Sequence, residues 1–234
     1  MHTKIDVVIM AGGKGKRLMP LTSNTPKPLL KVGNKPIIAH ITDQLASYKI
    51  KHITISVNYL SEQIIAYFKE NNTHKINFRF IEEDKPLGTI GALKLIENLK
   101  TDYILIMNAD LLTNADFNIM FNNFLLKDGD ALIATIPYKV DIPHGIVETK
   151  DGYVTDLKEK PSYTYYSNAG IYIFKKEHLD LIPENTFFNA TDLIEVLLNK
   201  DKKIVNYPIL NYWLDIGKPE DFKKAQEDVK NNKI

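Results

Sequence analysis

Cysteine is absent from the sequence of 234 residues, which excludes disulfide bonds and thiolate chemistry. The six histidines are scattered, and no pair of them has the spacing of zinc ligands. No apolar run approaches the ~20 residues of a membrane-spanning helix, and the start, MHTKIDVVIM, is not a signal peptide. The net charge is +1 with dispersed basic residues, which favours neither a nucleic acid nor a membrane as partner. We therefore expect a cytoplasmic protein.

Arginine is scarce as well, because Arg17 and Arg79 are the only two among 30 basic residues. Arg17 lies in the stretch 8–30, VIMAGGKGKRLMPLTSNTPKPLL, which continues an apolar strand and contains Lys27 between two prolines. Glycine recurs in it, at Gly12, Gly13 and Gly15. Small residues let backbone N–H groups approach a polyanion, and arginine adds a planar fork of donors that lysine lacks. The stretch therefore predicts a phosphate-binding loop.

This glycine loop, residues 12–17, does not match two familiar nucleotide-binding motifs. Arg17 follows Gly15-Lys16 where a Walker A loop needs Ser or Thr, and Leu18 stands where a dinucleotide fingerprint needs a third glycine. Prolines at 20, 26 and 28 argue against a helix directly after the loop. A plain glycine-rich turn is the alternative interpretation, which the nearby Arg17 and Lys27 disfavour.

Strand and helix patterns alternate through the first 140 residues. Apolar strands are predicted at 5–10, 53–57, 76–81, 103–107 and 131–137, and helices at 36–47, 61–68, 89–98 and 117–126. Ser61 and Thr89 are suited to cap two of these helices. The alternation predicts an α/β fold with a single Rossmann-like, doubly wound mixed sheet, which binds ligands beyond the carboxyl ends of its strands.

After about residue 140 the pattern changes. Asp151-Gly152 lies between two short strand patterns and indicates a hairpin. Further strands are predicted at 169–174 and 204–207, and helices at 191–198 and from Pro219 onward. We interpret residues after about 140 as a second half that completes the site.

Three acidic residues come where predicted strands end, namely Asp110, Glu159 and Asp215. Mg²⁺ prefers one or two carboxylates together with phosphate oxygens, so Asp110 and Asp215 near a phosphate loop are candidate ligands. Each aspartate alone is more typical of a turn or a helix cap than of a metal ligand. The segment 82–89, EEDKPLGT, has the composition of a loop and allows two interpretations, a charged connector or a platform where Gly88 admits a flat base.

Together these residues resemble the sugar-1-phosphate nucleotidyltransferases, also called nucleoside-diphosphate-sugar pyrophosphorylases. Two segments carry the resemblance most specifically, Ala11-Gly-Gly-x-Gly-x-Arg-Leu-x-Pro-Leu-Thr and Pro26-Lys-Pro-Leu-Leu. Shorter motifs follow in the family's order: Pro86-Leu-Gly-Thr, Asn108-Ala-Asp110, Glu159-Lys-Pro161, Asn168-Ala-Gly170 and Trp213-Leu-Asp215-Ile-Gly217. The match covers nearly the entire chain. Departures at Lys16, Ile90 and Ala109 remove no charged group.

The resemblance implies a glycosyltransferase-A-like fold with a small β-rich sugar-binding lobe. It divides the domain 1–234 into a nucleotide-binding half, about 1–140, and a sugar-binding half, about 141–234. It also implies the reaction, in which a sugar-1-phosphate oxygen attacks the α-phosphorus of a nucleoside triphosphate and pyrophosphate leaves. Catalysis of this kind consists mostly of positioning and charge stabilisation.

Roles are carried over by position. Arg17 would hold the triphosphate, Lys27 would bridge the reacting phosphates, and Asp110 and Asp215 would ligate Mg²⁺. The nucleotide contacts implied are Ala11, Gly12, Gly13, Gly15, Glu83 and Gly88. Lys160 would grip the sugar phosphate, and the remaining sugar contacts implied are Gly145, Glu159, Asn168 and Gly170.

Glu83 bears on the choice of base. Relatives that read thymine or uracil tend to carry Gln at this position, five residues before Gly88. Guanine presents two adjacent donors, and a carboxylate only accepts hydrogen bonds, so Glu83 favours GTP if it reaches the base. A solvent-facing Glu83 is the alternative.

Within the family the sequence is most similar to bacterial guanylyltransferases that use glucosamine-1-phosphate in legionaminic acid synthesis. Mannose-1-phosphate guanylyltransferases come next, and thymidylyl- or uridylyltransferases stay open. Two other classes also remain: a nucleotide-sugar-binding paralogue without turnover, which retention of all four charged groups disfavours, and a cytidylyltransferase that uses an alcohol phosphate. The partners expected are a nucleoside triphosphate and a sugar-1-phosphate, with a homo-oligomer possible.

Overall fold

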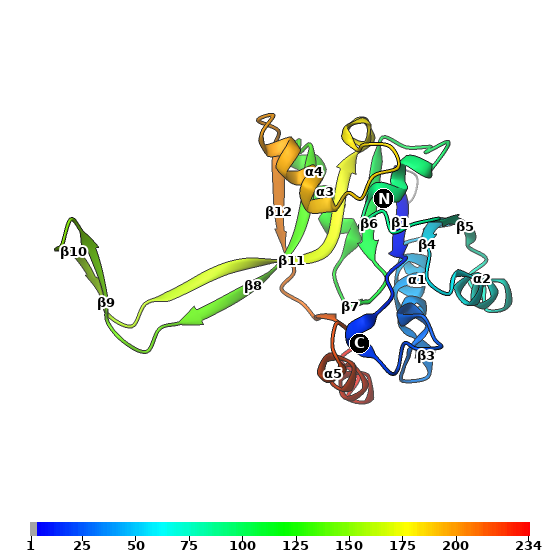
Figure 1. Cartoon of the computed structure of the whole chain (residues 1–234), viewed down its shortest axis with the longest axis horizontal. Helices are drawn as coiled ribbons and strands as arrows, with labels where there is room; N and C mark the ends of the chain where they lie inside the picture. Colours follow the sequence, from blue (N-terminus) through cyan, green and yellow to red (C-terminus); the bar gives the residue numbers. More distant parts are fainter. Residues whose placement is uncertain (1–3) are drawn as a thin grey trace.

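The computed structural model describes residues 4–234, so the first three residues of the start that argued against a signal peptide lie outside it. The main sheet has seven strands in the order β12-β8-β11-β6-β1-β4-β5 (Figure 1). These are β1 Asp6–Ala11, β4 His52–Val57, β5 Asn77–Glu82, β6 Tyr103–Asn108, β8 Ala131–Asp141, β11 Ser162–Lys175 and β12 Ile204–Pro208. Only β11 runs antiparallel to its neighbours in this sheet. The predicted α/β fold with a mixed sheet is confirmed.

Helices cover both faces of the sheet, because its central strands are apolar on both sides. The elements are α1 Ile37–Ser47, α2 Ser61–Glu70, α3 Phe117–Leu126, α4 Ala190–Leu198, and the 3-10 helices η3 Gly91–Leu95 and η4 Lys176–Leu181. Successive side chains of a strand point to opposite faces. Val7 and Ile9 therefore belong to the core under α1, α2 and α3, whereas Val8 belongs to the core under η3, η4 and α4.

A third apolar cluster ties the glycine loop to the end of the chain. After β1 the chain passes through two short 3-10 turns, η1 Lys16–Leu18 and η2 Lys27–Leu29, then β2 Lys31–Val32 and β3 Lys35–Pro36. β7 Leu111–Thr113 pairs with β13 Trp213–Asp215, and α5 Pro219–Lys230 follows. The cluster joins these segments through Leu18, Leu30, Leu112, Leu214 and Ala225. It anchors the loop that carries Arg17 and Lys27.

A long two-stranded ribbon leaves the body of the molecule (Figure 1). The outer parts of β8 and β11 pair without a break from Thr135–Asn168 to Asp141–Ser162. A hairpin of β9 Ile146–Lys150 and β10 Tyr153–Lys158 caps the ribbon. We call residues 138–168 the arm. It is the small β-rich lobe of this fold.

Most predicted elements are confirmed, and the differences have local causes. The predicted helix at 89–98 is wrong: only the 3-10 turn η3 forms, and the Thr89 hydroxyl caps α4 instead by accepting from Ala190 N at 2.7 Å. Ser61 does not cap α2, because Leu60 occupies the cap position in a left-handed conformation. β8 and β11 are longer than predicted, since their outer parts are exposed and carry no apolar pattern. Within residues 4–234, every helix is too short or too polar to cross a bilayer.

Candidate functional site

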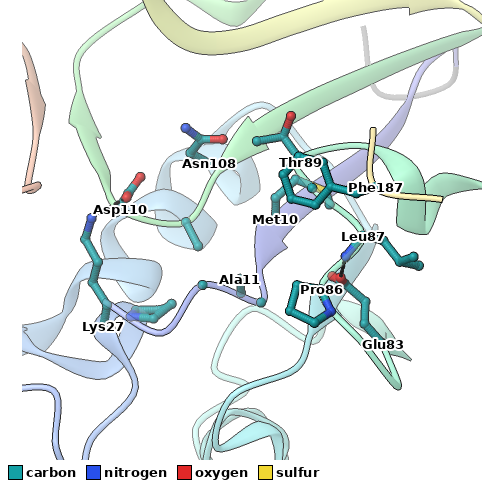
Figure 2. A pocket seen from close by; sticks show the side chains of 15 residues that line it. Met10, Ala11, Lys27, Glu83, Pro86, Leu87, Thr89, Asn108, Asp110 and Phe187 are labelled. Atoms are coloured by element: carbon teal, nitrogen blue, oxygen red, sulfur yellow. Dashed lines mark hydrogen bonds and ion pairs between the residues drawn. The ribbon is translucent and has the colours of Figure 1, made fainter. Parts of the chain in front are cut away.

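A cavity of about 310 Å³ opens beyond the carboxyl ends of β1 and β6, which are adjacent parallel strands (Figure 2). Its floor is formed by residues 10–13, at the end of β1 and the start of the glycine loop. Lys27, Asn108 and Asp110 lie at one end, and Glu83, Leu87 and Phe187 lie toward the other. The site therefore has a charged end and an end closed by the loop after β5.

The two predicted metal ligands lie side by side. Asp110 lies two residues after the end of β6. Asp215 is the last residue of β13 and pairs with Leu111 of β7, the neighbour of Asp110 in the chain. We call Asp110 and Asp215 the acidic pair. The buried Lys27 ammonium forms an ion pair with Asp110 and lies 3.9 Å from Asp215 Oδ1. Segments about 80 to 190 residues apart in the chain thus converge, as the sequence predicted.

The acidic pair has unused ligand capacity. Asp110 Oδ1 and Asp215 Oδ1 are buried and have no hydrogen-bond partner. Burial raises the pKa of Asp215, and the charge of Asp110 raises it further, against the opposing effects of Lys27 and Arg17. Buried oxygens without donors are costly unless a ligand satisfies them. Two such carboxylates at a phosphate loop fit a divalent cation, because hard cations prefer oxygen ligands.

Arg17 borders the acidic pair from the outside. A Cβ atom added at Gly217 would lie only 3.3 Å from Arg17 Nη2, so the guanidinium packs against the backbone that follows Asp215. Asp221, in the first turn of α5, holds this backbone by accepting from Gly217 N at 3.1 Å. Arg17 itself is exposed, and its donors are accessible to a ligand.

Glu83 closes the other end of the cavity. Its side chain is 7% exposed, so the alternative of a solvent-facing residue is wrong. Ser56 Oγ donates to Glu83 Oε1 at 2.6 Å, and Leu87 N donates to Oε2 at 3.0 Å. A Cβ at Gly12 would lie 2.9 Å from Oε1, so glycine is required for the loop to approach this carboxylate. Each oxygen retains a lone pair for a further donor.

The remaining predicted nucleotide contacts divide into two groups. Ala11, Gly12, Gly13 and Gly88 line the cavity. Gly15 is absent from its lining and instead turns the loop with φ 60°, its carbonyl accepting from Thr22 Oγ1 at 2.8 Å. The sequence reasoning did not single out Ser56, Thr89, Asn108 or Phe187 as site residues. A polar serine within the apolar strand 53–57 was a usable signal, whereas nothing marked Phe187.

A second hollow of about 200 Å³ adjoins the acidic pair. It is lined by Asn108, Asn168, Gly170, Trp213 and Asp215, among others. Two extra residues in β11 form a bulge here, since Asn168 pairs with Thr135 but Tyr172 pairs with Ile133. Gly170 has φ 70° in the bulge and lies against the Asn108 side chain. The predicted sugar contacts Asn168 and Gly170 therefore do lie next to the acidic pair.

Gly145, Glu159 and Lys160 lie elsewhere. Glu159 approaches Gly145, where an added Cβ would be 3.1 Å from Glu159 Oε2, so these two predicted contacts are together. All three residues are exposed on the outer arm, away from the body (Figure 1). The structure does not bring them to the acidic pair of the same chain, because the ribbon of β8 and β11 carries them outward.

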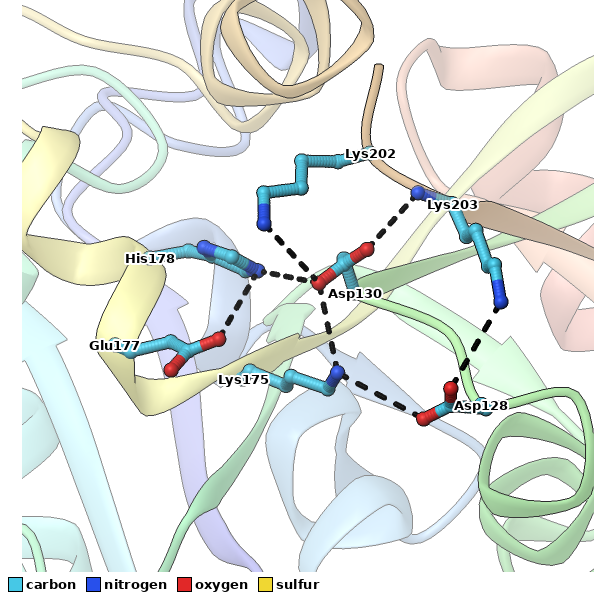
Figure 3. Close-up of polar contacts among 7 residues, drawn as sticks. All are labelled: Asp128, Asp130, Lys175, Glu177, His178, Lys202 and Lys203. Atoms are coloured by element: carbon cyan, nitrogen blue, oxygen red, sulfur yellow. Dashed lines mark hydrogen bonds and ion pairs between the residues drawn. The ribbon is translucent and has the colours of Figure 1, made fainter. Parts of the chain in front are cut away.

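Another acidic group lies at the amino ends of β8 and β12, which Asp130 and Lys203 directly precede. Figure 3 shows its polar contacts. Asp130, Glu177 and His178 are close enough together to hold a metal ion. Asp130 precedes β8 and is already surrounded by donors, with Lys203 N at 3.0 Å, His178 Nε2 at 3.2 Å and Lys175 Nζ at 3.4 Å. Burial would raise the pKa of Asp130, but these hydrogen bonds and the charges of Lys175 and Lys202 together lower it. This Asp130 cluster has the character of a structural ion-pair network.

Comparison with known proteins places the chain in a family. A D-glycero-alpha-D-manno-heptose 1-phosphate guanylyltransferase from Aneurinibacillus thermoaerophilus is 32% identical over 97% of this chain and 99% of its own length. A mannose-1-phosphate guanylyltransferase from Mycobacterium tuberculosis is 29% identical over 97% of this chain. The chain spans only 65% of the length of this relative. It spans 61% of the length of a mannose-1-phosphate guanyltransferase from Pichia angusta.

Solved structures agree with the sequence relatives. The crystal structure of HddC from Yersinia pseudotuberculosis superimposes with a TM-score of 0.76 at 28% identity, over 96% of this chain and 99% of that chain. A structure of the same protein complexed with GMP-PN superimposes with a TM-score of 0.73 at 27% identity, with the same coverage. A family model described as nucleotidyl transferase matches residues 6–232. The chain therefore belongs to the nucleotidyl transferase family.

Proposed function

We propose that this protein transfers a guanylyl group from GTP to a sugar-1-phosphate and releases pyrophosphate. One observation carries the proposal: a cavity at the carboxyl ends of two parallel strands has Lys27 and two unsatisfied carboxylates at one end and a buried carboxylate at the other. The charged end suits a triphosphate and the far end suits a base. The HddC relative has been crystallised with GMP-PN, and the two relatives named above that match 97% of this chain are named as guanylyltransferases.

The choice of guanine rests on Glu83. Its carboxylate is held in place by Ser56 and Leu87 N and lies against the glycine loop at the cavity wall. An ionised carboxylate accepts hydrogen bonds and donates none, which complements the adjacent N1–H and 2-amino donors of guanine. Uracil and thymine present a single donor between two acceptors, so a carboxylate faces them with repulsion on either side.

The reaction is an in-line substitution. A phosphate oxygen of the sugar-1-phosphate forms a bond to the α-phosphorus of GTP, while the bond to the bridging oxygen of the β-phosphate breaks and pyrophosphate leaves. Lys27, between the glycine loop and the acidic pair, would neutralise the two reacting phosphates as they approach. Arg17 would donate its planar fork to the triphosphate. A Mg²⁺ ion held by Asp110 and Asp215 would supply further positive charge to the phosphate oxygens.

The sugar is the finer part of the proposal. Glucosamine-1-phosphate is the acceptor proposed from the sequence resemblance. Mannose-1-phosphate and D-glycero-alpha-D-manno-heptose 1-phosphate are the alternatives, because relatives are named for them. A nucleotide-sugar-binding protein without turnover is disfavoured because Arg17, Lys27, Asp110 and Asp215 are all present and three of them are in mutual contact range.

A pyrophosphate-release screen tests the function. GTP, ATP, UTP, TTP and CTP are each combined with the three sugar-1-phosphates, glucose-1-phosphate and phosphocholine, with Mg²⁺ or with excess chelator. We expect release with GTP and one of the three named sugar-1-phosphates, and none with chelator. Preference for UTP or TTP would contradict the guanine assignment, activity with phosphocholine would favour an alcohol-phosphate enzyme, and silence in every combination would contradict an enzyme.

A further inference from the structure

The arm has no partner within its own chain. Every residue from 147 to 160 is exposed, including the whole of β10. The arm nevertheless presents large apolar side chains, namely Tyr138, Val147, Tyr153, Val154, Leu157, Tyr165 and Tyr166, each at least half exposed. An isolated two-stranded hairpin is at best marginally stable in water, and contiguous exposed apolar groups mark interaction sites. The arm therefore requires a surface to pack against.

The arm also carries Gly145, Glu159 and Lys160, which the resemblance assigns to binding the sugar-1-phosphate. Val147 and Leu157 face each other across the hairpin, and Gly145 and Glu159 occupy the next positions on the same face. Lys160 follows and adopts a left-handed backbone conformation with φ 43°, directly before a proline. Nine other non-glycine residues of the described part of the chain also have a positive φ, so this conformation by itself marks a turn. The resemblance gives Glu159 and Lys160 a role toward the sugar phosphate.

The ribbon holds these residues away from their own acidic pair. Within β11, Ser162 lies six positions from Asn168, which is beside the acidic pair, and at strand rise this corresponds to roughly 20 Å. Glu159 comes three positions further along the chain, beyond the outer end of the strand. Seven consecutive residue pairs join the outer parts of β8 and β11, so a fold-back would break this ladder. The bulge at its base is fixed by Trp213 Nε1 donating to Ala169 O at 3.0 Å and Gly170 N donating to Asn168 Oδ1 at 2.9 Å.

The cavity in the body of the molecule has few cations with which to bind a second phosphate. Among residues 4–234, Lys27 is the only lysine or arginine that lines the main cavity or the adjoining hollow, and it is engaged with Asp110. Arg17, which borders the acidic pair, is assigned to the triphosphate. A sugar-1-phosphate brings a dianion to this place and requires an additional cation nearby. A second copy of this chain supplies both the cation, on its arm, and a body that accepts the first copy's arm. A reciprocal exchange closes with two-fold symmetry.

We propose, relying on the proposed function, that two copies of this chain exchange their arms, so that Glu159 and Lys160 of each protomer complete the sugar-1-phosphate subsite of its partner. The active site is then composite: one protomer provides Arg17, Lys27 and the acidic pair, and the other provides the grip on the acceptor phosphate. The exposed apolar side chains of the arm become buried in the dimer.

Complementation between two inactive variants tests the exchange. Lys160→Ala damages the arm and Asp110→Asn damages the body, and each homodimer should lose activity. The two chains are co-expressed with different affinity tags, and the heterodimer is isolated by two successive purifications. We expect it to recover about half of the wild-type kcat per dimer, because one of its two sites is intact. A heterodimer as inactive as its parents, beside an active wild type, would overturn the proposal.

The matched control combines Lys160→Ala with Glu159→Ala, two variants with the same intact body and damaged arms. This heterodimer should not recover, because both of its sites receive a damaged arm, and recovery equal to that of the first heterodimer would contradict arm exchange. A wild type that is inactive with every substrate pair contradicts the proposed function, and the exchange is then judged by molar mass alone.

Molar mass in solution provides that second measurement. Residues 139–164 are replaced by Asn-Gly, which joins the directly paired Tyr138 and Tyr165 through a two-residue turn. We expect the wild type to be a dimer by light scattering at micromolar concentration and the shortened variant to be a folded monomer, with its folding checked by circular dichroism. A monomeric wild type, or a shortened variant that remains a dimer, contradicts arm exchange.

Discussion

Two clusters of carboxylates and cations lie at opposite ends of the strands of the main sheet. They differ in how many hydrogen-bond donors their carboxylate oxygens have. The Asp130 cluster, at the amino ends of β8 and β12, surrounds one carboxylate with donors from Lys175, His178 and Lys203, which lowers the pKa of Asp130. The acidic pair, at the carboxyl ends, sets two carboxylates together with one ammonium and leaves two oxygens without donors, which raises the pKa of Asp215.

The difference separates structural charge from functional charge. A network whose donors and acceptors match contributes to stability and has nothing to offer a ligand. A pair with unused oxygens reduces the stability of the ligand-free protein and gains from any cation that enters. Charge content alone does not distinguish the two, since both combine aspartate with lysine. The number of donors per carboxylate oxygen does.

The largest effect is expected for Asp110→Asn. This change removes a charged ligand and an oxygen without a donor, so kcat should fall by about three orders of magnitude, equivalent to ~4 kcal/mol in the barrier. Relief of the repulsion between Asp110 and Asp215 opposes the loss of the Lys27 ion pair, so the melting temperature should change little. Pyrophosphate release and thermal unfolding measure the two quantities. Asp130→Asn is the matched control at the other end of the strands, with kcat expected within about twofold of wild type. Equal losses of kcat in the two variants would contradict the comparison.

A smaller loss is expected for Arg17→Lys. The charge remains, but the planar fork that can bind two phosphate oxygens is lost. One transition-state contact of this kind typically contributes ~3 kcal/mol, so kcat should fall on the order of a hundredfold. Arg79→Lys, on a strand outside the cavity, is the control and should leave kcat unchanged. A rate within a factor of two of wild type would make Arg17 only a surface cation.

Base choice should respond to Glu83→Gln. The amide keeps the size of the side chain but replaces one acceptor with a donor, so it suits uracil or thymine better than guanine. A hydrogen bond to a charged group contributes about 1.5–3 kcal/mol, so the GTP/UTP ratio of kcat/KM should fall at least tenfold. The ratio is measured for both proteins under identical Mg²⁺ concentration. An unchanged ratio removes Glu83 from base recognition.

The smallest effect concerns stability at the Asp130 cluster. Asp130→Asn should lower the melting temperature by about 3–8 °C at neutral pH, equivalent to ~1–3 kcal/mol. Because the folded-state pKa of Asp130 lies below its ordinary value of 3.8, the stabilisation is complete well above that value and is lost as pH falls through the folded-state pKa. Melting curves of the two proteins should therefore converge in acid. A constant difference down to strongly acidic pH would contradict this origin.

The sequence predicted the parts of the fold that burial dictates. Helix α3 coincides with the predicted 117–126 because its apolar residues repeat at helical spacing and Asp116 caps its first turn. The predicted helix at 89–98 failed because Gly88 and Gly91 press against backbone carbonyls of residues 186–188, a long-range contact without a local signal. The acidic pair was predictable, since both aspartates follow strands that end at the same edge of the sheet.

Two features of the site depended on three-dimensional structure. No local pattern tells whether Glu83 in a charged loop turns inward, because its burial depends on Ser56, 27 residues earlier in the chain. The hairpin of β9 and β10 was predicted from Asp151-Gly152, whereas the ribbon that carries it outward was hidden, since the exposed outer parts of β8 and β11 mix polar and apolar residues. The motif Glu159-Lys-Pro161 predicted a role toward the sugar phosphate but gave no information on which chain's cavity these residues reach.

The unpartnered arm has a consequence for how turnover scales with protein concentration. A composite site exists only in the associated form, so the fraction of active protein follows the monomer–dimer equilibrium. On dilution below the dissociation constant, activity per mole should decline, and on reconcentration it should return with second-order kinetics. A cell could thus regulate the flux through this enzyme by the amount of chain it makes, with a steeper than proportional response and without any separate effector.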